Sequence, residues 1–449
     1  MSFPRYAEYR PSAVEWLGDI PAHWRATRFS RVIAGIKDGT HGTFVRVNTG
    51  LPLLSAKNVH DGRLEIDESE SLISEIDHTE IVANGFPRNG DLLLTIVGTI
   101  GRTCIFRFDQ PIAFQRSVCF IRLITRMAPD FFFNFIRSKF FQEHLQGRSK
   151  SSAQAGVYIG DVMATSVAFP PGIDEQTAIV TFLDRETAKI DALVAEQEKL
   201  IALLKEKRQA LISHAVTKGL DPNVPMKDSG IEWLGQVPAH WAVTKCGRFL
   251  SILSGYAFPS SSFDVSGNGT KLLRGVNVGV GELRWDETVY WERSLGDGLD
   301  DFELSVDDLV IGMDRPLIAA GIRVAKVRAE DIPCLLLQRV ASLRTLAGLE
   351  SDFLMHCLSA PMFIAHFLPD TTGVSVPHIS PEQISAFEIA IPPLDEQRAI
   401  VAFLSTEHDR FDALQVEGER AIILLKERRS ALISAAVTGK IDVRGLALA

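Results

Sequence analysis

The feature that most constrains the fold of this 449-residue chain is a long internal duplication. The segment "EWLGDIPAHW" at residues 15–24 returns as "EWLGQVPAHW" at residues 232–241, with eight of ten positions identical. A second pair starts at residues 170 and 392 ("PPGIDEQTAIV" and "PPLDEQRAIV"), and from Asp174 and Asp395 onward its offset is 221 positions. Two copies, and not a longer series, favour a pseudo-twofold arrangement over a solenoid.

Between the repeated segments lie two stretches, 25–169 and 242–391, that are far less alike. They share an Asn-Val pair at Asn58 and Asn277 and a glycine at Gly62 and Gly281. The order of segments predicts four parts: residues 1–169 as a docking segment with a first globular domain, 170–220 as a central helical region, 221–391 as a linker, second docking segment and second domain, and 392–449 as a distal helical region.

The segments after Pro171 and Pro393 have the pattern of long helices. Proline disfavours helix just before them, and Asp174 and Asp395 are placed to cap the new helices. Apolar residues then recur at heptad spacing, which predicts a seam for a partner helix at Ile190, Leu193, Leu200, Leu204 and Leu211, and at Phe411, Leu414, Ala421, Leu425 and Leu432. Such a stripe is also typical of plain bundle core. Because the helices are matched, we expect them to pair with each other in the antiparallel sense.

Composition limits the class of protein. A net charge of −9 requires that any nucleic-acid binding rest on a local basic face or on partner subunits. The five cysteines are scattered and never form CxxC, which predicts reduced thiols and no zinc site. No run reaches the roughly 18 apolar residues of a membrane span, and the first ten residues lack the apolar core of a signal peptide, so we expect a cytoplasmic protein with no membrane contact.

The ordered, duplicated set of motifs resembles the specificity subunit of type I restriction–modification systems. It consists of "GLDPNVPMKDSGIEWLGQVPAHW" at residues 219–241 and two copies of "PP…DEQ…IV.FL…LLKE" with "ALIS.AVT", and it covers essentially the whole chain. The resemblance implies a mixed α/β fold with two target-recognition domains, separated by two long antiparallel helices that set the gap between two DNA half-sites. It also implies double-stranded DNA, two methyltransferase subunits and restriction subunits as partners.

Catalysis is expected to lie with those partners. An adenine methyltransferase needs an Asn/Asp-Pro-Pro-aromatic loop for the flipped base, whereas this chain has "FPPG" and "IPPL". It also lacks GxxxxGK[ST] and HExxH, so we expect no catalytic residue, metal or cofactor in this chain, with S-adenosylmethionine, ATP and Mg²⁺ on the partner subunits. The alternative is a protein-interaction scaffold that never touches DNA, which the acidic second half favours.

Residues common to both domains cannot account for different half-sites. The shared residues therefore suit frame or phosphate-contacting positions: Asn58, Asn277, Gly62, Gly281 and the Gln-Arg pairs Gln115-Arg116 and Gln338-Arg339. Trp16, Trp24, Trp233 and Trp241 suit docking of each domain on the helices. Candidate DNA-reading residues are polar and differ between the copies: Thr40, His41, Lys57, Arg63, Arg102, Arg148, Lys150, Ser151 and Ser152 in the first domain, and Ser260, Ser261, Arg274, Arg284, Arg315 and His378 in the second. For any one of them, an ordinary surface role is the competing interpretation.

Overall fold

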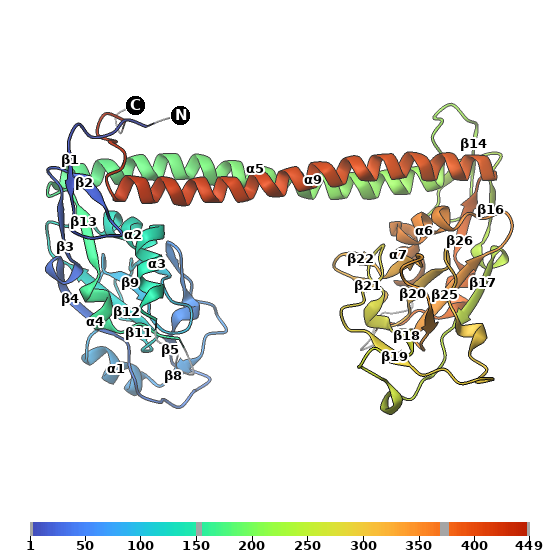
Figure 1. Cartoon of the computed structure of the whole chain (residues 1–449), viewed down its shortest axis with the longest axis horizontal. Helices are drawn as coiled ribbons and strands as arrows, with labels where there is room; N and C mark the ends of the chain where they lie inside the picture. Colours follow the sequence, from blue (N-terminus) through green and yellow to red (C-terminus); the bar gives the residue numbers. More distant parts are fainter. Residues whose placement is uncertain (1–2, 150–154, 369–376, 447–449) are drawn as a thin grey trace. The chain divides into compact units, whose positions relative to one another are not determined.

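The computed structural model describes residues 3–149, 155–368 and 377–446. The chain divides into two compact units, the first formed by residues 1–198 with 419–449 and the second by residues 199–418. Both long helices cross the boundary, so each unit contains one globular domain together with part of each helix (Figure 1).

The first unit is built on two small sheets. The larger has the order β10–β9–β12–β4, all antiparallel: Thr103–Ile105, Leu92–Thr95, Val118–Leu123 and Ile33–Asp38. The smaller has the order β11–β5–β8: Ala113–Phe114, Leu51–Leu54 and Leu72–Ile73, with β11 parallel to β5. Strand β9 reads "LLLT" and is buried throughout, as expected for a strand covered on both faces.

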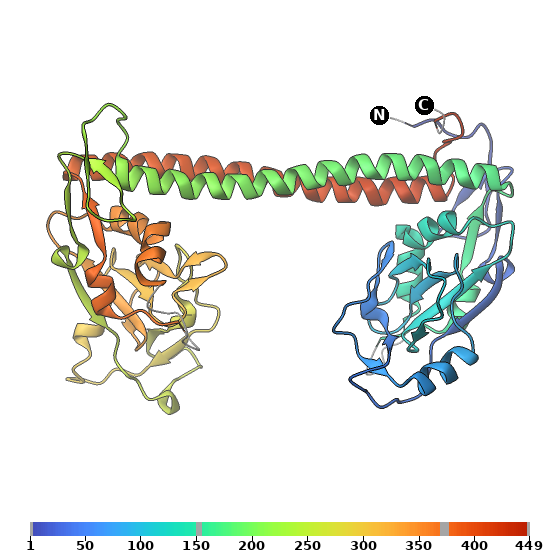
Figure 2. The same cartoon turned by 180° about the vertical axis from the view of Figure 1, so that it is seen from behind.

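Helices and short strands complete the first unit. They are α1 (Glu75–Ala83), α2 (Pro129–Arg137), α3 (Lys139–Gly147), α4 (Ile159–Ala164), β6 (Val59–His60) paired with β7 (Arg63–Leu64), and β3 (Arg25–Arg28) paired with β13 (Ser166–Phe169). The core is rich in phenylalanine: Phe131, Phe132 and Phe135 of α2 are fully buried in one cluster with Phe182 of the following long helix. Helices α2 and α3 thus join the sheet to the long helices (Figure 2).

The second unit repeats this topology with different residues. Its larger sheet has the order β17–β25–β20–β23: Leu250–Ser254, Val340–Thr345, Leu309–Gly312 and Val324–Lys326. Its smaller sheet has the order β19–β18–β24: Val289–Trp291, Thr270–Leu273 and Cys334–Leu336, with β24 parallel to β18. The remaining elements include α6 (Ser351–Ser359), α7 (Pro361–Phe367), α8 (Pro381–Ala386), β21 (Leu317–Ile318) with β22 (Gly321–Ile322), and β16 (Ala242–Lys245) with β26 (Glu388–Ile391). The predicted duplication and mixed α/β class are confirmed.

The two long helices are α5 (Ile173–Lys218, 46 residues) and α9 (Leu394–Val437, 44 residues). Each starts two residues before the position that follows its predicted cap, so Asp174 and Asp395 lie inside the first turn, where they meet the positive end of the helix dipole instead of capping it.

Within each unit the two helices run antiparallel. In the first unit Arg429 Nε donates to Asp191 at 2.8 Å, and Lys426 lies 4.0 Å from Glu198. In the second unit Arg208 pairs with Asp412. Asp191 and Asp412, like Arg208 and Arg429, are 221 positions apart, so the two arginine pairs are equivalent contacts of the two copies.

The seam differs from the predicted one at several positions. Ile190, Phe411 and Leu432 are buried, and Leu204, Leu211, Ala421 and Leu425 are half-buried, whereas Leu193, Leu200 and Leu414 are 46%, 46% and 42% exposed. The less exposed positions instead follow a strict 4-3 spacing: 190, 194, 197, 201, 204, 208 and 211, and their counterparts 411, 415, 418, 422, 425, 429 and 432. The positions of this stripe include glutamines, arginines and a glycine. A prediction based on apolar residues alone therefore chose neighbouring leucines that lie one position outside the stripe.

Both chain ends belong to the first unit. Strands β1 (Tyr9–Pro11) and β2 (Asp19–Pro21) form a hairpin that matches β14 (Met226–Asp228) with β15 (Gln236–Pro238) in the second unit. After α9, Lys440 donates to the carbonyls of Leu17 and Asp19 at 3.1 and 2.6 Å, and the Tyr9 hydroxyl donates to the carbonyl of Gly439 at 3.0 Å. The segment after α9 thus docks on the first hairpin by hydrogen bonds, where in the second unit the chain is continuous from α5 to β14.

All five cysteines are buried free thiols, and burial raises the pKa of Cys104 and of Cys334 to about 12. Among the described residues, no three histidine, cysteine or acidic side chains are placed to hold a metal ion. None of the helices that these residues form has the length and apolar character of a membrane span.

Candidate nucleic-acid interface

The repeated Trp-bearing segment meets the first turn of each long helix through a glutamate. In the first unit Glu175 accepts hydrogen bonds from Trp24 Nε1 at 3.0 Å and from the Tyr6 hydroxyl at 2.9 Å, and His23 Nε2 lies 2.9 Å away. Trp24 is fully buried. Burial, and then the Glu175 carboxylate, raise the pKa of Tyr6, so its hydroxyl remains a donor.

The second unit repeats this contact on Glu396. Trp241 Nε1 donates to that carboxylate at 2.9 Å, and His240 Nε2 lies 2.7 Å from it. The neighbouring glutamines are also equivalent: Gln176 accepts from the Ala128 amide at 2.8 Å, and Gln397 accepts from the Glu350 amide at 2.9 Å. The "DEQ" sequence therefore uses Glu for the tryptophan segment and Gln for the entry of α2 or α6.

The other two predicted docking tryptophans contact α3 and α7. Trp16 stacks on His144 with ring centroids 5.3 Å apart, and Trp233 meets the edge of His366 at 5.5 Å. All four tryptophans of the repeat thus lie against helical elements of their own unit.

Shared residues of the two domains form the frame of the loops. Asn58 accepts from the Ser55 amide at 2.9 Å and donates to the Glu65 carbonyl at 3.1 Å, while Asn277 accepts from the Arg274 amide at 3.1 Å and donates to the Arg284 carbonyl at 2.8 Å. Both side chains are buried, so their amides are used inside the protein.

A glycine begins the loop after β4 in the first unit and the equivalent loop after β17 in the second. A Cβ on Gly39 would lie 2.1 Å from the Phe114 carbonyl oxygen, and one on Gly255 would lie 2.2 Å from the Leu337 carbonyl oxygen. At both positions the backbone crosses another segment so closely that only glycine fits, and we call Gly39 and Gly255 the crossing glycines. Thr40 and His41 follow directly: Thr40 Oγ1 accepts from the Gly42 amide at 3.1 Å, and His41 Nε2 lies 2.8 Å from Asp38.

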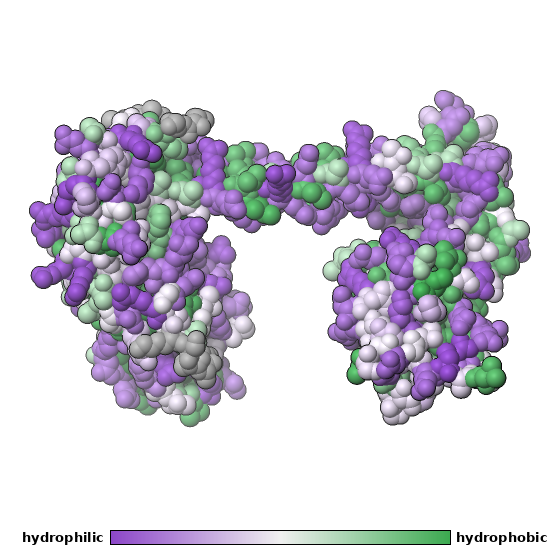
Figure 3. Space-filling model, in the orientation of Figure 1, coloured by the Kyte–Doolittle hydropathy of each residue, from purple (hydrophilic) through white to green (hydrophobic). Residues whose placement is uncertain are grey.

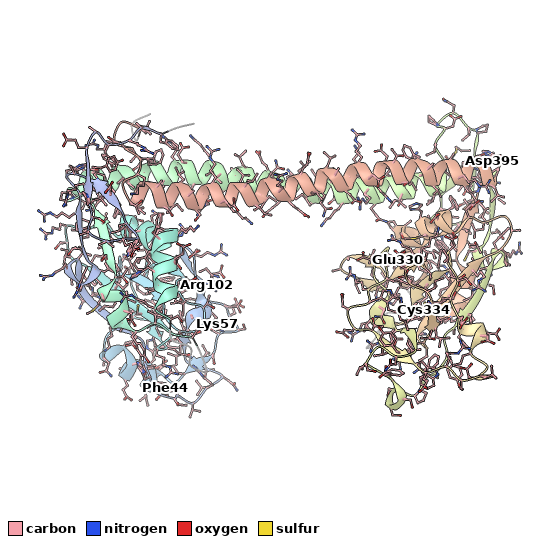
Figure 4. The ribbon with its side chains drawn as sticks, viewed as in Figure 1. Phe44, Lys57, Arg102, Glu330, Cys334 and Asp395 are labelled. Atoms are coloured by element: carbon pink, nitrogen blue, oxygen red, sulfur yellow. The ribbon has the colours of Figure 1, made fainter. Side chains whose placement is uncertain are left out.

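Several predicted DNA-reading residues of the first unit are exposed but paired with nearby acids. Lys57 lies 2.8 Å from Glu70, Arg63 lies 2.5 Å from Glu65, and Arg148 lies 3.7 Å from Asp161. Arg102 has no ion pair among the described residues, and it extends from the same side of the unit as Lys57, nearer to the long helices (Figure 4). Lys150, Ser151 and Ser152 lie outside the described residues.

In the second unit the predicted residues fall into two groups. Ser260 and Ser261 are exposed in a short 3-10 turn, and Arg284 pairs with Glu282 at 3.0 Å. Arg274 contacts the Glu287 carbonyl. Arg315 and His378 form the second group, which adjoins a carboxylate.

That carboxylate is Asp314. His378 Nδ1 lies 2.8 Å from it and Arg339 donates to it at 2.6 Å. Burial would raise the pKa of Asp314, but these two hydrogen bonds outweigh burial and hold its pKa below the ordinary value. Arg315 and Arg339 both have positive φ, of 47° and 70°, which is uncommon for arginine and is typical of functional loops. Sequence reasoning missed Asp314 and assigned Arg339 to the frame, because the cluster is formed by segments that are distant in the sequence.

The long helices carry exposed apolar residues outside their seam. In the first unit Leu193 and Leu424 are 46% and 55% exposed, and in the second unit their counterparts Leu414 and Leu203 are 42% and 49% exposed. Figure 3 shows hydrophobic surface on the helices of each unit. Each unit thus presents an equivalent pair of exposed leucines at matched positions of its helices.

Comparisons with known proteins support the predicted family resemblance. Residues 241–422 match the family model described as the type I restriction modification DNA specificity domain. The EcoAI specificity subunit of Escherichia coli is 33% identical over 199 residues, which are 44% of this chain and 33% of that subunit. The MjaVIII specificity subunit of Methanocaldococcus jannaschii is 25% identical over 240 residues, or 53% of this chain and 54% of that one. The matches therefore span a third and about half of these relatives.

The fold has a solved counterpart. A chain from the structural work on complex assembly and conformational transition of the type I R-M system has a TM-score of 0.65 with this one. The two are 18% identical, and the likeness covers 93% of this chain and 98% of that chain. At this identity the likeness establishes the fold alone.

Proposed function

We infer that this chain, whose resemblance to type I restriction–modification specificity subunits is confirmed by these matches, is the DNA-recognition subunit of such a complex. It binds a bipartite, asymmetric DNA target with one half-site for each unit. The chain itself is non-catalytic, and it positions adenine methyltransferase and restriction subunits that supply S-adenosylmethionine, ATP and Mg²⁺ chemistry.

One observation carries this proposal: the two units share a frame and differ in their exposed polar side chains. The Trp–Glu contacts, the buried asparagines and the crossing glycines are equivalent in both units. The exposed groups differ, since the Asp314–His378 pair occupies the loops after β20 and before α8, whereas Val97 and Gly156 make the equivalent backbone bridge in the first unit. Equal frames with unlike contact groups suit two readers of different sequences.

The helices support the spacing and the partners. An α-helix rises about 1.5 Å per residue, so the 46 residues of α5 extend over about 69 Å without a break. A continuous helix pair suits a spacer between half-sites, because DNA readers must meet their sites at a set multiple of base pairs. The equivalent leucine pairs, one in each unit, suit one methyltransferase subunit on each unit.

The test is to co-express the chain with its methyltransferase partner and to map methylated adenines across the host genome. We expect a two-part motif with a constant gap. In parallel, binding of a duplex carrying that motif should weaken linearly with the logarithm of salt concentration. A protein-interaction scaffold would give neither a methylated motif nor a salt slope, and either absence would reject the proposed function.

A further inference from the structure

A basic cleft of about 360 Å³ opens in the first unit between its globular domain and α9. Four of its lining side chains are positively charged and come from three elements: Arg102 precedes β10, Arg137 ends α2, and Lys426 and Arg429 lie on α9. Asp61 is the acidic residue that lines it. The chain as a whole has a net charge of −9, so this cluster of cations is a local departure from its acidic composition.

The cations of this cleft are incompletely neutralised. Arg429 is paired with Asp191 at 2.8 Å, and Lys426 approaches Glu198 only at 4.0 Å. Arg102 and Arg137 form no ion pair in the part of the chain that the structure describes; the guanidinium of Arg137 instead lies over the Phe133 ring, 4.8 Å from its centroid. Burial, and then the charge of Arg429, lower the pKa of Arg137. A cation held in such surroundings gains stability when an anion arrives.

The second unit keeps the two helix cations as Lys205 and Arg208, but it lacks free cations at the equivalent positions of its globular domain. Arg137 corresponds to Ser359, whose carbonyl accepts a hydrogen bond from Gln209 of α5 at 2.8 Å. Arg102 corresponds to Arg323. The guanidinium of Arg323 already donates hydrogen bonds inside the protein, to the carbonyls of Val278 and Asp314 at 3.0 and 3.1 Å. The free cations therefore distinguish the first unit from the second.

We propose that this cleft is a binding site for backbone phosphate of duplex DNA, with Arg102, Arg137 and Lys426 as its contacts. It acts in the first unit and fixes the duplex against α9 independently of base sequence. Lys57 extends from the same side of the unit as Arg102, so a duplex backbone that follows this side would meet both (Figure 4). This inference rests on the proposed DNA-binding function and adds that the two units hold the backbone unequally.

The test measures how affinity for a fluorescent duplex of unrelated sequence depends on salt, with the full-length chain. Each lost phosphate contact should lower the slope of log K against log salt by about 0.9, which at 0.1 M salt is roughly an eightfold loss of affinity. Arg137→Ser installs the residue found in the second unit, and Lys426→Ser changes an exposed side chain that the fold does not require. We expect both variants to show this loss. Arg107→Ser, which removes an exposed arginine paired with Asp130 elsewhere in the same unit, should retain the wild-type slope.

The outcomes separate the two levels of inference. Wild-type chain that shows no salt-dependent binding would overturn the proposed function together with the cleft. Wild-type binding that Arg137→Ser and Lys426→Ser leave unchanged, with folding verified by circular dichroism, would overturn the cleft and leave the function standing. If inorganic phosphate competes as well as duplex DNA does at equal phosphate concentration, the cleft is a small-anion site and the proposal is also rejected.

Discussion

The contact between the tryptophan segment and the long helix predicts that equivalent substitutions in the two units have unequal effects. The side chain of Glu175 is 14% exposed and serves three partners, whereas that of Glu396 is 43% exposed and serves two. Glutamine in place of either residue keeps the size but removes the charge and one acceptor oxygen. Trp24 Nε1 and the Tyr6 hydroxyl both donate to Oε1 of Glu175, and Oε2 faces His23. In the glutamine variant these two buried donors therefore share a neutral oxygen, and the new amide group faces His23.

The magnitude follows from these contacts. Hydrogen bonds to a charged group contribute about 1 kcal/mol more than neutral ones, and an unsatisfied buried donor costs about 1–3 kcal/mol. Glu175→Gln should therefore destabilise its contact by about 3 kcal/mol, because two charge-assisted hydrogen bonds become neutral ones and the His23 contact is lost. Glu396→Gln should cost about 1 kcal/mol, because water can reach the half-exposed carboxylate and replace the lost acceptor.

Amide hydrogen exchange followed by mass spectrometry reads each contact separately. The Trp24 amide donates to the Pro21 carbonyl at 2.9 Å, and the Trp241 amide donates to the Pro238 carbonyl at 3.0 Å, so they are matched reporters. We expect exchange around Trp24 to rise about 100-fold in Glu175→Gln, and exchange around Trp241 to rise about fivefold in Glu396→Gln. Equal acceleration in the two variants, or none in Glu175→Gln, would refute the reasoning.

Three further predictions concern pH, the crossing glycines and the helix pair. Burial, and then His408, lower the pKa of His356 from 6.5 to about 4, so the unfolded chain binds a proton that the folded unit does not. Stability of the second unit should fall by up to about 3 kcal/mol as pH drops from 6.5 to 4. His356→Asn installs the residue found at the equivalent position of the first unit, Asn134, and it should flatten this pH dependence in denaturant titrations. Gly39→Ala should lower the Tm of the first unit in calorimetry while Gly35→Ala does not, because nothing lies within 4 Å of a Cβ at residue 35. Insertion of seven residues at matched positions in both α5 and α9 lengthens the helix pair by about 10 Å. The gap in the methylated motif should therefore grow by about 3 base pairs, and both half-sites should stay unchanged. An altered half-site would contradict the spacer role.

The extent to which sequence predicted this molecule depended on the type of feature. Heptad spacing and the duplicated segments predicted two long helices and two similar domains, because periodicity survives in sequence. The seam was displaced at Leu193, Leu200 and Leu414, since leucines outside the interface resemble leucines inside it. The Asp314 cluster and the cleft around Arg137 are assembled by tertiary contacts between distant segments, and no local spacing reports such contacts. The same holds for the docking of Lys440 on the first hairpin.

The most direct test of two independent readers on one frame is to exchange residues 25–169 for the corresponding domain of another specificity subunit and to sequence the methylated adenines. The exchange leaves the Trp24 contact, both long helices and the second unit intact. We predict that one half of the methylated motif changes while the other half and the gap remain. A change in both halves, or a motif that is unchanged throughout, would contradict the assignment of one half-site to each unit.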